Sequence, residues 1–126
     1  MRTNEQGFTL ISVMVAVVIL TIGILALAKT SATVVRASAR AATRTEAVAV
    51  ARSYMEEIRS RQPVNMVSEA LVYCDREGQP DPAGPYTRQV IVTDLASNLK
   101  SVQVVVTMPG SSVPVELITQ AFVGSF

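Results

Sequence analysis

The chain has 126 residues, with 11 basic and 10 acidic side chains, one cysteine, and no histidine or tryptophan. A single cysteine excludes an intrachain disulfide, and the lack of histidine excludes the usual zinc ligand sets and any Ser-His-Asp or Cys-His nucleophile system. A net charge of +1 gives no electrostatic footprint for a dedicated nucleic-acid binder. We therefore expect no enzymatic activity, no cofactor, no metal and no small-molecule substrate, and nucleic acid is not an expected partner.

Residues 8–28 form an uninterrupted apolar run, in which 17 of 21 residues are hydrophobic and none is charged. As an α-helix, this length reaches about 32 Å, which is enough to cross the hydrocarbon core of a bilayer. A plain membrane anchor and a secretory signal peptide cut after Ala28 both fit the run, although it is longer than the apolar region of most signal peptides. A buried core helix fits poorly, because few core helices are this long without a charge.

The junction in front of the run distinguishes these interpretations. A short leader containing Arg2 and Glu5 ends in Gly7, and Phe8–Ile11 follows directly. This junction resembles the prepilin signal of type IV pilins and of the pseudopilins of type II secretion, and the continuation is most similar to minor pilins of the pilus-modification type. The resemblance implies that a prepilin peptidase cleaves between Gly7 and Phe8, and that Phe8 is then N-methylated. Glycine suits such a site because its bare backbone can approach a catalytic centre closely.

Ser12 departs from the family pattern. In most of the family the fifth residue after the cut is Glu, whose carboxylate is thought to pair with the terminal amine of a neighbouring subunit. A serine hydroxyl carries no such charge. By analogy with the family, we expect a subunit at the tip or in the initiation complex of a filament, rather than one repeated along the shaft.

The resemblance also implies a location. The chain would cross the inner (cytoplasmic) membrane once, with its head on the periplasmic or extracellular side, and would later enter a pilus or pseudopilus. Charge counting gives the opposite orientation, because Lys29, Arg36, Arg40 and Arg44 follow the run whereas only Arg2 precedes it. The cleavage signature takes precedence, since its elements are position-specific and charge counting is only a bias.

Helix-favouring sequence continues beyond the membrane segment. No proline occurs before Pro63, and Gly23 is the last glycine before residue 78, so we expect one helix from Phe8 to Arg61. Gly23 is interpreted as a point of close packing between helices. An apolar stripe recurs at helical spacing and is expected to pack on the head; it comprises Val34, Ala37, Ala41, Val48, Ala51, Met55 and Ile58.

Arg36, Arg40 and Arg44 recur every four residues on a helix face that we expect to differ from the apolar stripe. A solvated face or a contact with a partner protein is the favoured interpretation, because acidic residues follow further along the same helix. DNA backbone and anionic lipid headgroups are the alternative ligands.

The remaining residues read as strands. We expect strands at Arg88–Asp94, Lys100–Met108 and Val113–Val123, with a short fourth at Ala70–Cys74. Short connections predict an antiparallel meander. Because such a head is small for a core of its own, its valine face should pack on the helix. The prediction is an α+β, pilin-like ladle with a cleaved leader at 1–7, a transmembrane and filament-core half-helix at 8–28, an amphipathic half-helix at 29–62, and a β-rich head at 63–126.

The loop from Asp75 to Pro85 is rich in proline, glycine and acid. Asp75, Glu77 and Asp81 are of the ligand type that calcium prefers, but their spacing matches no EF-hand, and an exposed turn is the favoured interpretation. Cys74, which precedes the loop, is expected to be buried at a strand end.

These observations predict a minor type IV pilin, which is a structural subunit and not an enzyme. Its expected partners are other pilins through the N-terminal helix, the prepilin peptidase and methyltransferase, and the inner membrane before assembly. A minor pseudopilin of a type II secretion system would share these features. A DNA-uptake or adhesive pilin, which binds a ligand through its head or its arginine row, is the alternative from another functional class.

Overall fold

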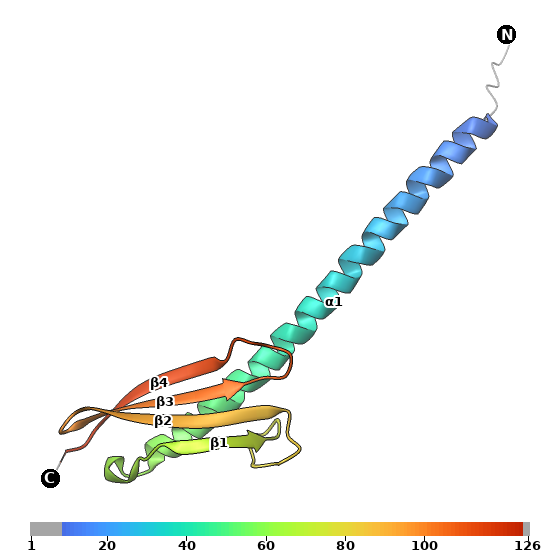
Figure 1. Ribbon diagram of the computed structural model, residues 1–126. Helices are drawn as coiled ribbons and strands as arrows, with labels where there is room; N and C mark the ends of the chain where they lie inside the picture. The colour runs from blue at the N-terminus through green and yellow to red at the C-terminus, as the bar shows by residue number, and fades with distance from the viewer. Residues whose placement is uncertain (1–8, 125–126) are drawn as a thin grey trace. The chain divides into compact units, whose positions relative to one another are not determined.

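The computed structural model describes residues 9–124. They form the long helix α1 (Leu10–Ser60), the short 3-10 helix η1 (Pro63–Asn65), and the strands β1 (Glu69–Cys74), β2 (Tyr86–Ala96), β3 (Leu99–Thr107) and β4 (Val115–Phe122) (Figure 1). The chain divides into two compact units, Met1–Ala39 and Arg40–Phe126. The α+β class predicted from the sequence is confirmed.

Helix α1 is continuous because its sequence holds no proline and one glycine. Threonine hydroxyls inside it are satisfied locally: Thr21 Oγ1 donates to the Val17 carbonyl at 2.7 Å, and Thr45 Oγ1 does the same to Ala41 at 2.9 Å. The helix ends at Ser60, one residue before the predicted end, and Pro63 opens η1 shortly afterwards. Its predicted first residue, Phe8, lies outside the described residues.

The four strands form one antiparallel sheet in the order β1-β2-β3-β4, so the predicted meander is confirmed, including its short first strand. The turn between β3 and β4 contains Gly110, whose φ of 73° suits a residue without a side chain. The register places Val90, Val104 and Leu117 side by side, which aligns one apolar row across three strands. Val113, which was predicted to begin the last strand, lies before β4 and is 58% exposed.

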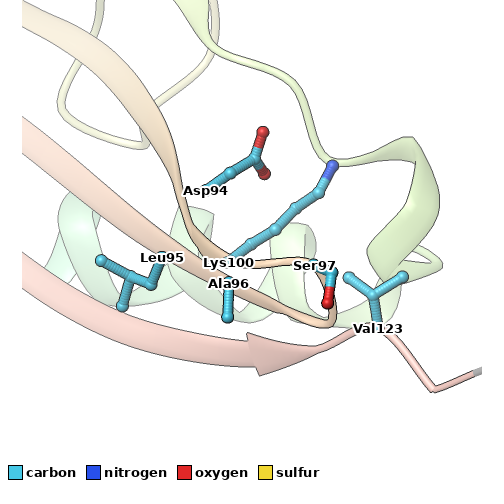
Figure 2. A pocket seen from close by; sticks show the side chains of 6 residues that line it. All are labelled: Asp94, Leu95, Ala96, Ser97, Lys100 and Val123. Atoms are coloured by element: carbon cyan, nitrogen blue, oxygen red, sulfur yellow. The ribbon is translucent and has the colours of Figure 1, made fainter.

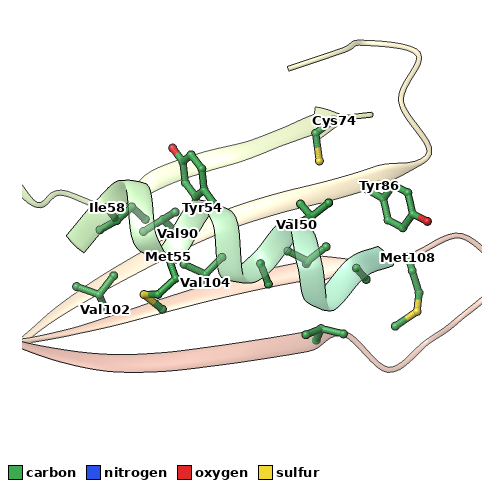
Figure 3. Packing of buried hydrophobic residues seen from close by; sticks show 14 of the residues in the cluster. Val50, Tyr54, Met55, Ile58, Cys74, Tyr86, Val90, Val102, Val104 and Met108 are labelled. Carbon is green, nitrogen blue, oxygen red and sulfur yellow. The ribbon is translucent and has the colours of Figure 1, made fainter. Parts of the chain in front are cut away.

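The core of the second unit lies between this apolar face of the sheet and the last four turns of α1 (Figure 3). Val102, Val104 and Val106 of β3 are fully buried, as their alternation predicts. The buried helix residues are Ala47, Val50, Ala51, Tyr54, Met55 and Ile58. The prediction that the helix stripe packs on the valine face is therefore confirmed for the second half of that stripe.

Two predictions about the helix surface were wrong. Val34, Ala37 and Ala41 are exposed, because burial of the helix begins only at Ala47. The arginine row was expected on another face, but Arg40 and Arg44 precede Ala47 by seven and three residues, which are helical repeats. They therefore extend the line of the buried face one to two turns beyond the core.

Candidate functional site

The first half of α1 presents apolar side chains in every direction. Residues 10–28 are all exposed, and the exposed fraction of the large hydrophobic side chains among them runs from 51% at Val13 to 78% at Leu10. With a mean hydropathy of 3.0 in its most apolar window, α1 is the one described helix long and apolar enough to cross a membrane. Length and composition are weak grounds by themselves, because a signal sequence meets the same criterion.

The start of α1 is fixed by a local polar pair. The Ser12 N–H donates to the Thr9 carbonyl at 2.9 Å, and the two hydroxyl oxygens lie 3.0 Å apart. The Ser12 side chain is thus occupied within its own helical turn and carries no charge. Gly7 and Phe8, the predicted cleavage and methylation residues, lie outside the described residues, so both stay predictions.

Residues 2–28 match the model of the prokaryotic N-terminal methylation motif. This is the type IV pilin and pseudopilin signal. It covers the leader, the predicted junction at Gly7 and Phe8, and the apolar run up to Ala28. Comparison of the chain with curated proteins and with solved structures gives no match.

The motif supports a type IV pilin or pseudopilin, which is a structural subunit and not an enzyme. It implies processing by a prepilin peptidase and assembly with other pilins. Together with the exposed apolar helix, it fits an inner-membrane-anchored pilin that later enters a pilus. The candidate surface for anchoring and assembly is the apolar first half of α1, because an all-round apolar helix is typical of one that lipid or other helices cover.

A polar cluster inside the second unit was missed by the sequence analysis. Arg88 on β2 is only 7% exposed; its guanidinium carbon lies 3.4 Å from the centre of the Tyr54 ring, and its Nη1 donates to the Gly78 carbonyl at 2.8 Å. The Tyr54 hydroxyl donates to Glu69, which also pairs with Arg61 at 2.6 Å. The cluster therefore links α1, β1, β2 and the residue that follows the helix.

These contacts shift the pKa values of Glu69 and Tyr54 in the cluster. Burial alone would raise the pKa of Glu69, but the hydrogen bonds from Tyr54 and Arg61 outweigh it, and the pKa lies below its ordinary value. Burial and the hydrogen bond to Glu69 raise the pKa of Tyr54. The lowered pKa of Glu69 and the raised pKa of Tyr54 both favour an ionised Glu69 carboxylate that accepts a hydrogen bond from a neutral Tyr54 hydroxyl. The arrangement holds no nucleophile beside a base, so we read it as structural.

A second tyrosine ties the other end of the buried helix face to the sheet. The hydroxyl of Tyr86, at the start of β2, donates to Glu46 of α1 at 2.6 Å, and Arg76 lies 3.8 Å from the same carboxylate. Burial raises the pKa of Tyr86 to about 12, and the hydrogen bond to Glu46 acts in the same direction. The phenol therefore stays neutral over the physiological range.

In the loop after β1, aspartate carboxylate oxygens accept hydrogen bonds from the backbone of the loop itself. Asp75 Oδ1 accepts the N–H groups of Glu77 and Gln79 at 3.0 and 2.8 Å, and Asp81 Oδ1 accepts that of Ala83 at 2.9 Å. Within residues 9–124, no three histidine, cysteine or acidic side chains gather in a way that could hold a metal ion. Cys74 is fully buried, as expected, and burial raises the pKa of its thiol.

A hollow of about 380 Å³ lies at the turn between β2 and β3 (Figure 2). It is lined by Asp94, Leu95, Ala96, Ser97, Lys100 and Val123. The Lys100 ammonium donates to the Met66 carbonyl at 3.3 Å. One carboxylate and one already engaged ammonium offer no catalytic set, and we assign no function to this hollow.

Proposed function

We propose that the chain is a minor type IV pilin that is cleaved between Gly7 and Phe8 and N-methylated on Phe8. The observation that supports this best is the methylation motif at residues 2–28 on the same segment as an apolar helix with every side chain exposed. A cut upstream of this helix leaves the product anchored. The helix then serves first as the membrane span and later as the part that packs among other pilin helices.

Ser12 supports a position at the tip or in the initiation complex. A carboxylate in an apolar environment needs a positive partner, since an unpaired one costs about 2.5–3.5 kcal/mol on insertion scales. Ser12 introduces no such cost, and it bonds to Thr9 in its own helical turn. A subunit without the carboxylate needs no amine from a neighbour, which suits a place where the stack begins.

Mass spectrometry of the full chain purified from its native membranes tests the cleavage. We expect a mature N-terminus at Phe8 that carries one additional methyl group. Gly7→Val should block the cut, because a branched side chain prevents the close backbone approach, whereas Gln6→Val serves as a control of equal bulk. A mature chain that starts at Lys29, or one that keeps Met1, would contradict the proposal.

Quantitative immunoblotting of sheared filaments tests the tip position. We expect few copies of the chain per filament beside an abundant major pilin. If the chain were the main component of purified filaments, the tip position would be wrong. Deleting the gene distinguishes a pilin from a minor pseudopilin: loss of surface filaments indicates the former, and loss of protein secretion with filaments intact indicates the latter.

A further inference from the structure

Strand β4 forms one edge of the sheet, and no strand of the described chain lies beyond it (Figure 1). It is eight residues long, contains no proline, lysine or arginine, and pairs with β3 without a register shift. Short length, proline, lysine and bulges are the features by which edge strands normally avoid further pairing. The β4 edge has none of these features, so it is open to another strand.

The hydrogen-bond phase of β4 identifies the residues that face this open edge. The Val123 N–H donates to the Asn98 carbonyl at 2.7 Å, and this pair continues the register directly beyond Leu99 and Phe122. Hydrogen-bonded and non-hydrogen-bonded pairs alternate along an antiparallel ladder. Every second residue back from Val123 therefore bonds to β3, and the residues between them direct their N–H and C=O groups outward. These outward-facing residues are Glu116, Ile118, Gln120 and Phe122.

The four outward-facing residues carry four N–H and four C=O groups without a partner. Within residues 9–124, no hydrogen bond is made by these backbone groups. The four side chains are exposed, to 65% at Ile118 and 63% at Phe122, so nothing in the described chain blocks access to the edge. A row of alternating donors and acceptors at strand spacing is complementary to the backbone of another extended segment.

The opposite edge of the sheet is closed by the chain itself. Strand β1 has six residues, and its register with β2 is irregular. The loop that follows folds back along it: the Asp81 N–H donates to the Tyr73 carbonyl at 2.9 Å, and Pro80 forms a bridge with Cys74. The two edges therefore differ, and β4 is the one that is open over its whole length.

We propose that β4 accepts an added β-strand from another protein, which extends the four-stranded sheet by one strand. The identity of the partner rests on the proposed function, which makes it another subunit of the pilin assembly. The added segment is extended over about seven residues, enough to span β4 from Glu116 to Phe122. On the helix side of the sheet it carries apolar residues, because Leu117 and Ala121 are half-buried at the margin of the core.

A second copy of the chain fits this edge less well. Its β1 edge is closed, so β4 of one copy cannot pair along β1 of the next. Antiparallel pairing of two β4 edges over all their outward-facing residues places Glu116 opposite Phe122 and Ile118 opposite Gln120. Each apolar side chain then meets a polar one, which forgoes the favourable cross-strand pairs. A subunit at the tip also has other pilins as its neighbours, so the added strand comes from a different protein.

Gln120→Pro tests the backbone of the edge while leaving the bonds to β3 in place. Proline removes an outward-facing N–H, and edge strands tolerate it where its nitrogen faces away from the neighbouring strand. With the chromosomal gene replaced, immunoblotting compares the chain in sheared filaments with the chain in membranes. We expect incorporation to fall about tenfold. Gln120→Ala is the matched control: it removes the same side chain, keeps the N–H, and should incorporate as the wild type does.

Urea denaturation of the full chain in detergent checks the fold of these variants. Gln120→Pro should unfold at a urea concentration close to that of Gln120→Ala. Thr119→Pro should unfold at a much lower concentration, because the Thr119 N–H bonds to Val102 of β3 in the assigned phase. An equal loss of stability in the two proline variants would overturn the assignment of the outward-facing residues, and the proposal with it.

Hydrogen exchange gives a readout that needs no variant. In the detergent-solubilised full chain, four of the eight amides of β4 face outward and should exchange quickly. In the chain recovered with its neighbours from sheared filaments, these amides should be protected by bonds to the added strand. Exchange in β4 that is unchanged by assembly would overturn the inference.

Equal incorporation of Gln120→Pro and the wild type would also overturn it, as would an equal loss in Gln120→Ala. A photoreactive residue in place of Ile118 distinguishes the partners: we expect an adduct with another pilin, whereas an adduct of twice the mass of the chain would assign the edge to a second copy. A wild-type chain that is absent from every filament fraction would overturn the proposed function itself. Failure of strand addition alone leaves the wild-type chain in the filaments, so the two failures are distinguishable.

Discussion

Arg88 shows how a charged side chain is accommodated in a small core. It lies on β2 facing the helix, and its burial is offset by stacking on the Tyr54 ring and by donation to the Gly78 carbonyl. A cation over an aromatic face contributes about 0.5–2 kcal/mol, depending on how far it is desolvated. Within residues 9–124, no buried side-chain nitrogen or oxygen lacks a hydrogen-bond partner. The polar cluster therefore restrains where β1 and β2 sit on the helix.

Tyr54→Phe tests the cluster with little change of volume. Removing the hydroxyl takes a hydrogen bond from the Glu69 carboxylate, and bonds to charged groups contribute about 1.5–3 kcal/mol. We expect the free energy of unfolding to fall by an amount in that range, measured by urea denaturation of the full chain in detergent. Tyr73→Phe is the control, because Tyr73 is 52% exposed on the outer face of the sheet; an equal loss there would contradict the role of the cluster.

The lowered pKa of Glu69 predicts that the fold becomes less stable as the pH falls. Its pKa in the folded chain lies below the ordinary value of 4.5, so the unfolded chain binds the proton more readily. The contribution is fully present above about pH 4.5 and is lost as the pH falls through the lowered pKa of the folded chain. Thermal melts of Glu69→Gln and the wild type should therefore differ most near neutrality and converge in acid. A difference that widens as the pH falls would contradict this sign.

The sequence analysis also missed most at the scale of single residues, and Arg88 with its polar cluster is the main example. Arg88 alternates with Val90 and Val92, which places it on the inward face of the strand. That alternation was the available signal, but charge normally indicates solvent, and its partners Tyr54 and Gly78 come from distant parts of the chain. The methylation motif at residues 2–28 could be predicted from the sequence because its elements are adjacent in the chain, whereas the cut between Gly7 and Phe8 stays a prediction.

At the scale of elements, strand β3 carries the clearest division between faces. Val104 is fully buried, and its neighbour Val105 points to the outer face. Val104→Ala should lower the free energy of unfolding by about 2 kcal/mol, because the cavity is enclosed by helix and sheet. Val105→Ala removes the same atoms and should cost less than half as much. Equal losses in chemical denaturation would mean that the outer face is also covered.

Gly23 is the element-scale test of helix packing. A Cβ placed on it meets no atom within 4 Å in the chain itself, and alanine favours a helix over glycine by about 1 kcal/mol. Gly23→Ala should therefore leave the isolated chain intact or slightly more stable. Gly23→Leu should reduce incorporation into filaments, because small residues allow close helix approach. Ala28→Leu, five residues further on and on a different face of the helix, is the control for bulk, and unchanged incorporation of Gly23→Leu would refute the packing role.

Local periodicity predicted the elements well and their extent less well. Pro63 marks the end of the helix, and alternating valines mark the strands. The apolar stripe indicated a packing face, but it did not indicate where along the helix the sheet begins. Alanine occurs both on exposed and on buried helix faces, so Ala37 and Ala41, which are exposed, could not be told from Ala47, which is buried. The extent of burial depends on the length and placement of strands that lie far along the chain.

At the scale of the whole molecule, the two compact units differ in what covers their apolar side chains. The unit Arg40–Phe126 encloses its own core, whereas the first half of α1 has no partner within the described chain. The methylation motif at residues 2–28 implies that this first half takes part in assembly with other pilins. Folding and assembly thus depend on different parts of one sequence.

For the pilin proposed above, the exposed apolar half of α1 has an energetic consequence for fibre growth. Lipid tails are as apolar as leucine, so moving this segment from the bilayer into a bundle of similar helices removes little further surface from water. The hydrophobic effect can therefore hold the subunit in either place without favouring the transfer. Extraction must be driven by work supplied from outside the subunit, or by contacts that form only once it has left the lipid.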